Sequence, residues 1–427
     1  MNAAIIFFLL LVLMLTGMPI SISLGLTVLT FLFGFTEVPL ESVALKLFTG
    51  IEKFEIMAIP FFILAGNFLT HGGVARRMIN FAASMVGHWY GGLGLGGVLA
   101  CALFAAVSGS SPATVVAIGS ILLPAMVKAG FPKSFGAGVI TTSGALGILI
   151  PPSIVMVMYS VATNTSVGAL FMAGVVPGLA LAGVLAGVTW YRAKKYDYPR
   201  LPKASWLERL KAFKESAWGL LLIVIVMGGI YTGLFTPTEA AAMSAVYAFF
   251  VAVFVYKDMG LKDVPRVLLN SANMSAMLLY IITNAVLFSF IMTNENIPQA
   301  LAEWMLGNGL GPIAFLLACN IILLLAGNFM EPSSIVLIFA PILFPVAVKL
   351  GIDPVHFGII MVVNMEVGMC HPPVGLNLYV ASGITKMGIT ELTVAVWPWL
   401  LAMVGFLMVV TYWPGLSLWF PRWLGMM

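Results

Sequence analysis

The 427-residue sequence predicts an all-α polytopic membrane protein made of two inverted structural repeats, with two re-entrant helical hairpins and two broken transmembrane helices. Hydrophobic residues make up 61% of the chain and charged residues 8%, and the mean hydropathy is +1.08, which leaves too little polar surface for a soluble body of this length. Two further observations support the prediction. Gly and Pro motifs recur about 220 residues apart, and a basic segment separates the two copies.

The repeat is clearest at its prolines. Leu122-Leu123-Pro124 and Pro151-Pro152 in the first copy recur as Leu343-Phe344-Pro345 and Pro372-Pro373 in the second. Hydrophobic segments that are interrupted by Gly and Pro at matching positions of two halves mark the binding site of a secondary transporter.

The elements follow from apolar runs close to the ~20 residues that a membrane span needs. In the first repeat, 1–191, we expect helices at 3–16, 20–36 and 56–70, a hairpin over 91–128, a broken helix over 133–165 and a last helix over 168–191. In the second repeat, 215–427, we expect scaffold helices, a hairpin over 310–349 and a broken helix over 354–386. Amphipathic stretches at 40–53 and 297–306 are predicted to lie along the membrane interface.

The segment 192–214 is predicted to be a basic cytoplasmic linker. It holds eight of the twenty Lys and Arg residues, and short loops rich in these residues stay on the cytoplasmic side. Five predicted crossings separate the N-terminus from this linker. The N-terminus is therefore expected on the outer side, and the second repeat is expected to have the opposite orientation from the first.

The candidate chemistry lies where helices break. Two hairpin tips, 108–114 and 327–334, and two interruptions, 141–152 and 366–373, place Gly, Ser, Asn and Pro at membrane depth. Irregular backbone is tolerated there only when it is buried in protein or lines a wet cavity. Unwound carbonyl oxygens can coordinate Na⁺, and the N–H groups of half-helix N-termini can face a carboxylate. Oxygen ligands without a carboxylate cluster favour Na⁺ over Ca²⁺.

Several residues have a second interpretation. Glu331 and Glu366 leave proton coupling open, because an intramembrane carboxylate is a functional candidate by default. His371 fits either a titrating group or a neutral histidine bonded to a carbonyl. Glu239 follows Thr236 at the spacing of a capping box and is expected to cap a helix. The sequence has no GxxxxGK[ST] loop, so we expect no ATP hydrolysis by such a loop.

At these motifs the sequence resembles the large membrane (permease) subunit of the tripartite ATP-independent periplasmic (TRAP) transporters, over essentially the whole chain. The motifs that carry the resemblance are TPTEAA at 236–241, GIDPVHFG at 351–358, GILIPPS at 147–153 and PPVGLNL at 372–378. The chain departs from the family pattern at His371, where the family usually has Thr, and at Glu331, where it often has Asp.

The resemblance implies a transporter and not an enzyme. Proteins of this family import a small organic acid, such as sialic acid or a C4-dicarboxylate, using a Na⁺ gradient and an elevator movement. They lie in the bacterial inner membrane, which would make the outer side periplasmic. They pair with a small four-helix membrane subunit and receive the substrate from a periplasmic substrate-binding protein.

Carried onto this chain, the resemblance implies two sodium sites and a substrate site between the tips. One sodium site would comprise Ser108, Ser111, Gly144 and Gly147, and the other Gly327, Gly368 and Cys370. The substrate would lie near Ser110, Thr142, Asn328 and Asn377.

Two alternatives stay open at the level of sequence. A stand-alone sodium/divalent-anion symporter of related architecture would need no binding protein. An intramembrane hydrolase would use Ser108 or Ser110 as nucleophile and His371 as base, which requires these side chains to lie within hydrogen-bond reach.

Overall fold

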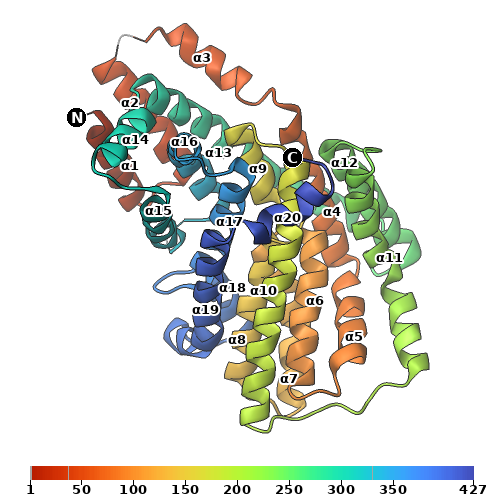
Figure 1. Cartoon of the computed structure of the whole chain (residues 1–427). Helices are drawn as coiled ribbons and strands as arrows, with labels where there is room; N and C mark the ends of the chain where they lie inside the picture. Colours follow the sequence, from red (N-terminus) through yellow and green to blue (C-terminus); the bar gives the residue numbers. More distant parts are fainter. Residues whose placement is uncertain (1, 37, 329) are drawn as a thin grey trace.

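The computed structural model describes residues 2–36, 38–328 and 330–427, so Phe329 in the second predicted tip lies outside the described residues. Its elements are helices throughout the described ranges, and eight of them there are long and apolar enough to cross a membrane (Figure 1). The all-α membrane fold class predicted from composition is confirmed.

The first half of the chain forms ten α-helices and two short 3₁₀ helices within the described residues. They are α1 (Asn2–Leu15), α2 (Ile20–Phe35), α3 (Leu40–Thr49), η1 (Phe54–Met57), α4 (Ala58–His71), α5 (Val74–Val86), α6 (Gly92–Ser108), α7 (Ser111–Lys128), α8 (Lys133–Gly144), η2 (Ala145–Ile148), α9 (Ile154–Thr163) and α10 (Val167–Lys195).

The second half repeats much of this order. Its elements are α11 (Trp206–Tyr231), α12 (Pro237–Phe250), the π-helical turn η3 (Val251–Val255), α13 (Val264–Asn294), α14 (Ile297–Gly307), α15 (Pro312–Gly327), α16 (Pro332–Lys349), α17 (Pro354–Cys370), α18 (Leu376–Thr385), α19 (Ile389–Tyr412) and α20 (Gly415–Trp423). The pair α15–α16 corresponds to α6–α7, and α17–α18 corresponds to α8–α9.

Both interruptions contain a Pro-Pro pair. Between α8 and α9 the chain passes through η2 and Pro151-Pro152, and between α17 and α18 it passes through Pro372-Pro373. Proline has no N–H to donate and its ring clashes with the preceding turn, so neither helix can continue through its pair. Both Pro-Pro bonds are cis.

The linker is shorter than the sequence predicts. Helix α10 continues to Lys195 and α11 begins at Trp206, so only residues 196–205 connect them, at the lower end of the molecule in Figure 1. Basic side chains in the last turn of α10 favour its extension, since they lie at the negative end of the helix dipole. Ser205 and Glu208 form a capping box that starts α11 early.

The helices at the centre are fastened by buried aromatic and polar contacts. Trp399 of α19 is fully buried, and its indole Nε1 donates a 2.9 Å hydrogen bond to Thr189 Oγ1 of α10. A Cβ at Gly138 would lie 2.6 Å from the Trp399 ring, so glycine lets α8 reach α19. This packing fastens α8, the first part of the first broken helix, to α19, and α19 to α10.

The helix cap predicted at Glu239 is confirmed. The Glu239 amide donates to Thr236 Oγ1 at 3.3 Å, and the Glu239 carboxylate accepts from the Thr236 amide at 2.8 Å. Both residues therefore serve to start α12.

Replacing Thr236 with Ala removes this cap. We expect a loss of about 1 kcal/mol in the free energy of unfolding, seen as a lower unfolding temperature in detergent. Thr232→Ala is the matched control, because that hydroxyl bonds only to carbonyls of its own helix, with a change below about 0.5 kcal/mol. Equal effects of the two substitutions would contradict the role of the cap.

Candidate functional site

A first junction joins the tip between α6 and α7 to both broken helices; we define it as Ser110, Ser111, Thr141, Gly144, Gly147, Cys370 and Asn377. The Asn377 amide donates to Ser111 Oγ at 2.8 Å and to the Thr141 carbonyl at 3.3 Å. Ser111 Oγ in turn lies 3.1 Å from Asn377 Oδ1. The side chains of Ser111, Thr141 and Asn377 are fully buried. One asparagine of the second half thus holds the tip and the break of the first half.

Glycine makes the close approach at this junction possible. A Cβ at Gly147 would lie 2.6 Å from the Ser110 carbonyl oxygen and 2.8 Å from Ser111 Cα. A Cβ at Gly144 would overlap the Val115 side chain and lie 3.2 Å from the Val115 backbone nitrogen. Backbone therefore faces backbone between the tip and the break, which leaves carbonyl oxygens as the nearest polar groups.

The first junction is neutral in its own side chains, although the buried Glu366, one turn before Cys370 on α17, interacts electrostatically with the Cys370 thiol. Segments 108–114, 141–152 and 371–377 contain no Lys, Arg, Asp or Glu, and no three His, Cys, Asp or Glu residues gather anywhere in the described ranges. Ser143 Oγ, beside the break, is buried without a hydrogen-bond partner. Neutral oxygens at membrane depth suit a monovalent cation better than a divalent one, which takes several carboxylates.

A second junction lies between α15 and the end of α17; we define it as Gly327, Asn328, Gly368, His371 and Gly375. A Cβ at Gly327 would lie 2.9 Å from Gly368 Cα, so the two backbones touch. With its amide nitrogen facing the break, Asn328 donates to the carbonyls of His371 at 3.0 Å and Pro372 at 3.1 Å. Gly375 has φ +54°, and its N–H donates to the Asn328 carbonyl at 3.3 Å.

The structure brings together most of the residues predicted for sodium, in the two expected groups. Ser111, Gly144 and Gly147 meet in the first junction, and Gly327 and Gly368 meet in the second. Ser108 lies at the edge of the first junction, where its hydroxyl is 2.9 Å from Thr114 Oγ1.

Cys370 is placed differently from the prediction. The sequence predicts it beside Gly327 and Gly368, but its thiol donates to the Thr141 carbonyl at 3.5 Å and lies 3.7 Å from the Asn377 amide nitrogen. Its side chain therefore belongs to the first junction, because two residues along helix α17 turn its direction by roughly half a turn away from the Gly368 contact.

The residues predicted for substrate do not form one cluster. Ser110 and Asn377 lie in the first junction and Asn328 in the second, whereas the Thr142 hydroxyl donates to the Gly138 carbonyl within α8. Sequence reasoning missed Gly66 of α4, where a Cβ would lie 3.1 Å from the Ser108 carbonyl. No motif marks Gly66, so only the fold reveals that α4 contacts the tip.

The two buried carboxyl groups differ. Glu331 is the N-cap of α16, where its carboxylate accepts from the Ser334 amide at 3.0 Å and the Ser334 hydroxyl at 3.1 Å. Glu366 is fully buried, and neither of its carboxyl oxygens has a hydrogen-bond partner. The Glu331 carboxylate is thus used in capping α16, whereas the Glu366 carboxyl group has no hydrogen bond.

The arrangement required of a hydrolase does not form. Ser108 contacts Thr114, and the His371 ring is held by Asn328 at 2.9 Å. The imidazole therefore belongs to the second junction, while both candidate nucleophiles belong to the tip between α6 and α7.

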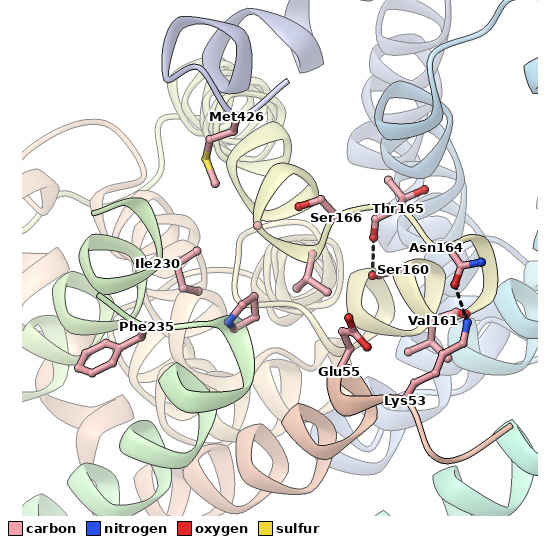
Figure 2. Close-up of a pocket in the computed structure, with 13 residues that line it drawn as sticks. Lys53, Glu55, Ser160, Val161, Asn164, Thr165, Ser166, Ile230, Phe235 and Met426 are labelled. Atoms are coloured by element: carbon pink, nitrogen blue, oxygen red, sulfur yellow. Dashed lines mark hydrogen bonds between the residues drawn. The ribbon is translucent and has the colours of Figure 1, made fainter. Parts of the chain in front are cut away.

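A separate cavity of about 480 Å³ opens at the end of the molecule away from the linker, and Figure 2 shows it. Its lining comes from the loop before α4, the α9–α10 turn and the α11–α12 turn. Lys53 donates to the Val161 carbonyl and to Asn164 Oδ1 at 2.8 Å. Partial burial lowers the pKa of the Lys53 ammonium, and the nearby Glu55 opposes this shift. Lys53 thus ties that loop to the end of α9.

Comparison with known families gives one match over nearly the whole chain. Residues 7–416 match the family described as "Tripartite ATP-independent periplasmic transporter, DctM component".

Individual relatives agree. The chain is 77% identical to the C4-dicarboxylate TRAP transporter large permease protein of Rhodobacter capsulatus, with 100% of both chains covered. It is 38% identical to the sialic acid TRAP transporter large permease protein of Vibrio cholerae, covering 96% of each chain. Among solved structures, the YdaH transporter of Alcanivorax borkumensis superposes with a TM-score of 0.63 over 88% of this chain and 89% of that one, at 15% identity, a likeness of fold alone.

The Ser111–Asn377 contact predicts energetic coupling between the two halves. In a double-mutant cycle of Ser111→Ala and Asn377→Ala, we expect a coupling of about 1 kcal/mol or more in the free energy of unfolding, because the two side chains bond directly. Ser111→Ala combined with Asn320→Ala is the control, since Asn320 bonds to Asn364 and Thr411 and not to Ser111. The effects of these two substitutions on the free energy of unfolding should be additive within about 0.5 kcal/mol. Additivity of Ser111 with Asn377 would refute the contact.

Proposed function

Because the chain belongs to the DctM-component family of the tripartite ATP-independent periplasmic (TRAP) transporters, we propose that it is the large permease subunit for Na⁺-coupled import of a C4-dicarboxylate. The choice of a C4-dicarboxylate over sialic acid rests on the far higher identity to permeases named for C4-dicarboxylates. Sodium coupling rests on the neutral first junction described above.

Sodium would be held by backbone oxygens of the tip and of the break. Gly147 lies so close to the Ser110 carbonyl that a Cβ would clash, and Gly327 and Gly368 make a second close contact, so the backbone of the tip and that of the break lie side by side. The ion would supply positive charge where the protein has none. A bound cation would also tie the tip to the break in each junction, since its ligands come from both.

The substrate carboxylates would face helix N-termini. Helices α7 and α18 begin at Ser111 and Leu376, so their first N–H groups lie next to the first junction. These free N–H groups and the positive end of each helix dipole favour an anion. Since no Lys or Arg lies in the segments of this junction, the anion would depend on sodium for charge balance. This dependence is the physical basis of the proposed coupling.

The body that contains both junctions would move past the other helices as an elevator. The proposed setting is the bacterial inner membrane, with the linker in the cytoplasm and the N-terminus in the periplasm. A small four-helix membrane subunit and a periplasmic substrate-binding protein would complete the transporter, and the word "tripartite" in the family description supports two further components.

Uptake into proteoliposomes tests this function. Vesicles containing the chain and its small membrane subunit would receive a labelled C4-dicarboxylate, with a Na⁺ or K⁺ gradient, and with or without the cognate binding protein. We expect uptake only when Na⁺ and the binding protein are both present. Sodium-driven uptake without the binding protein would establish the stand-alone symporter instead, and uptake indifferent to Na⁺ would exclude sodium coupling.

The glycine contacts give a sharper test of the sodium sites. Gly327→Ala places a methyl group against Gly368 backbone, and we expect sodium-driven uptake to fall about tenfold or more at normal expression. Gly383→Ala is the matched control, because a Cβ there meets open space. Uptake by this variant should stay within about twofold of wild type, since substitutions that create no clash have small effects. An unchanged sodium dependence in Gly327→Ala would remove the second junction from the proposal.

A further inference from the structure

A cavity of about 470 Å³ lies beside the linker, far from both junctions. It is lined by His88, Trp89 and Tyr90 from the loop between α5 and α6, by Trp190 of α10 and by Arg200 of the linker. Its volume is many times the roughly 30 Å³ that one water occupies in the liquid, so a polar group of several atoms fits it.

Arg200 is held in place at this cavity. Its guanidinium carbon lies 3.6 Å from the centre of the Tyr90 ring. The next residue fixes the backbone, because the Leu201 amide donates to the Gly87 carbonyl at 3.0 Å. The linker is therefore hydrogen-bonded to the α5–α6 loop, and these contacts hold the Arg200 side chain in position at the edge of the cavity.

Positive charge at the cavity is not balanced by carboxylates. Lys194 does not line the cavity, but its ammonium nitrogen lies 4.9 Å from the ring centre of Trp190, which does. The ion pairs within the described residues involve Arg76, Arg77 and Arg422, and none involves Arg200, Lys194 or the linker's own Asp197. Cations that are held by rings keep their charge available to an anion.

The residues around the cavity are typical of a membrane boundary. Trp89 is 53% exposed and Trp190 is 39% exposed, near the end of a 29-residue apolar helix that finishes in Lys194 and Lys195. Tryptophan with Lys and Arg at such a position is typical of the headgroup region on the cytoplasmic side. Basic pockets between helices on that side are suited to anionic headgroups.

We propose that this cavity binds the headgroup of an anionic phospholipid from the leaflet on the linker side. The phosphate accepts from the Arg200 guanidinium, Trp89 and Trp190 pack against the glycerol region, and the acyl chains extend into the bilayer beside α10. One lipid thereby links the base of the α6–α7 pair to the connection between the two repeats.

Native mass spectrometry of the full chain in detergent tests the proposal, with phosphatidylglycerol and phosphatidylcholine added in equal amounts. We expect phosphatidylglycerol to be retained preferentially. Arg200→Gln should weaken its retention about fivefold, the effect of one cation near an anionic headgroup. Lys203→Gln is the matched control, because it removes one charge from the same linker outside the cavity and should change retention less than twofold, below the effect of a contacting cation.

Three results would overturn the proposal. Equal retention of the two lipids by the unchanged protein shows no anion preference, a result that needs no variant. Equal effects of Arg200→Gln and Lys203→Gln assign the attraction to the diffuse charge of the linker. Displacement of phosphatidylglycerol by an equal concentration of inorganic phosphate makes the occupant a soluble anion. The unfolding temperature of Arg200→Gln, measured in parallel, separates lost binding from lost folding.

Discussion

The hydrogen bonds between Ser111 and Asn377 join residues 266 positions apart, and the rest of the candidate site depends on them. Both helix breaks leave backbone groups that no helix satisfies, and hydrocarbon supplies no partners. The Asn377 side-chain amide supplies such partners, because it donates both to Ser111 Oγ in the tip and to the Thr141 carbonyl. If this contact were absent, the tip between α6 and α7 would lose its side-chain bond to the second half. A site between two repeats can therefore be neutral and still be well ordered.

The two junctions solve the same problem in different ways. The first uses an asparagine side chain across the repeats, together with Gly147 against the tip and Gly144 against Val115. The second uses direct backbone contact between Gly327 and Gly368, with Asn328 satisfying the carbonyls of the Pro-Pro break. None of the residues that define either junction is Lys, Arg, Asp or Glu, and the buried Glu366 lies one turn before Cys370. The proposed sodium ions would thus supply the positive charge that balances an anionic substrate. This charge balance would couple substrate binding to sodium binding.

Much of this architecture was predictable because proline and glycine mark breaks directly. The hairpin expected over 91–128 corresponds to α6 and α7, and the interruptions fall at the predicted Pro-Pro pairs. Contacts across the repeats were not predictable, since the internal similarity shows which segments correspond and not which ones touch. For this reason the sequence does not show that the Cys370 side chain lies at the first junction, or that Gly66 contacts the tip. The sequence predicts a linker that is too long, because basic residues fit both a cytoplasmic loop and the last turn of a helix. Here Arg192, Lys194 and Lys195 lie in the last turn of α10.

Hydrogen–deuterium exchange of the full chain in Na⁺ and in K⁺ tests most directly whether sodium binds at the two junctions. Peptides that contain Ser111 and peptides that contain Gly368 should exchange more slowly in Na⁺, because the bound ion would draw backbone of the tip and of the break together. Peptides from α11, which carries no residue of either junction, should be unaffected. Identical exchange in the two salts at both junctions would contradict sodium binding there, whatever the transported acid is.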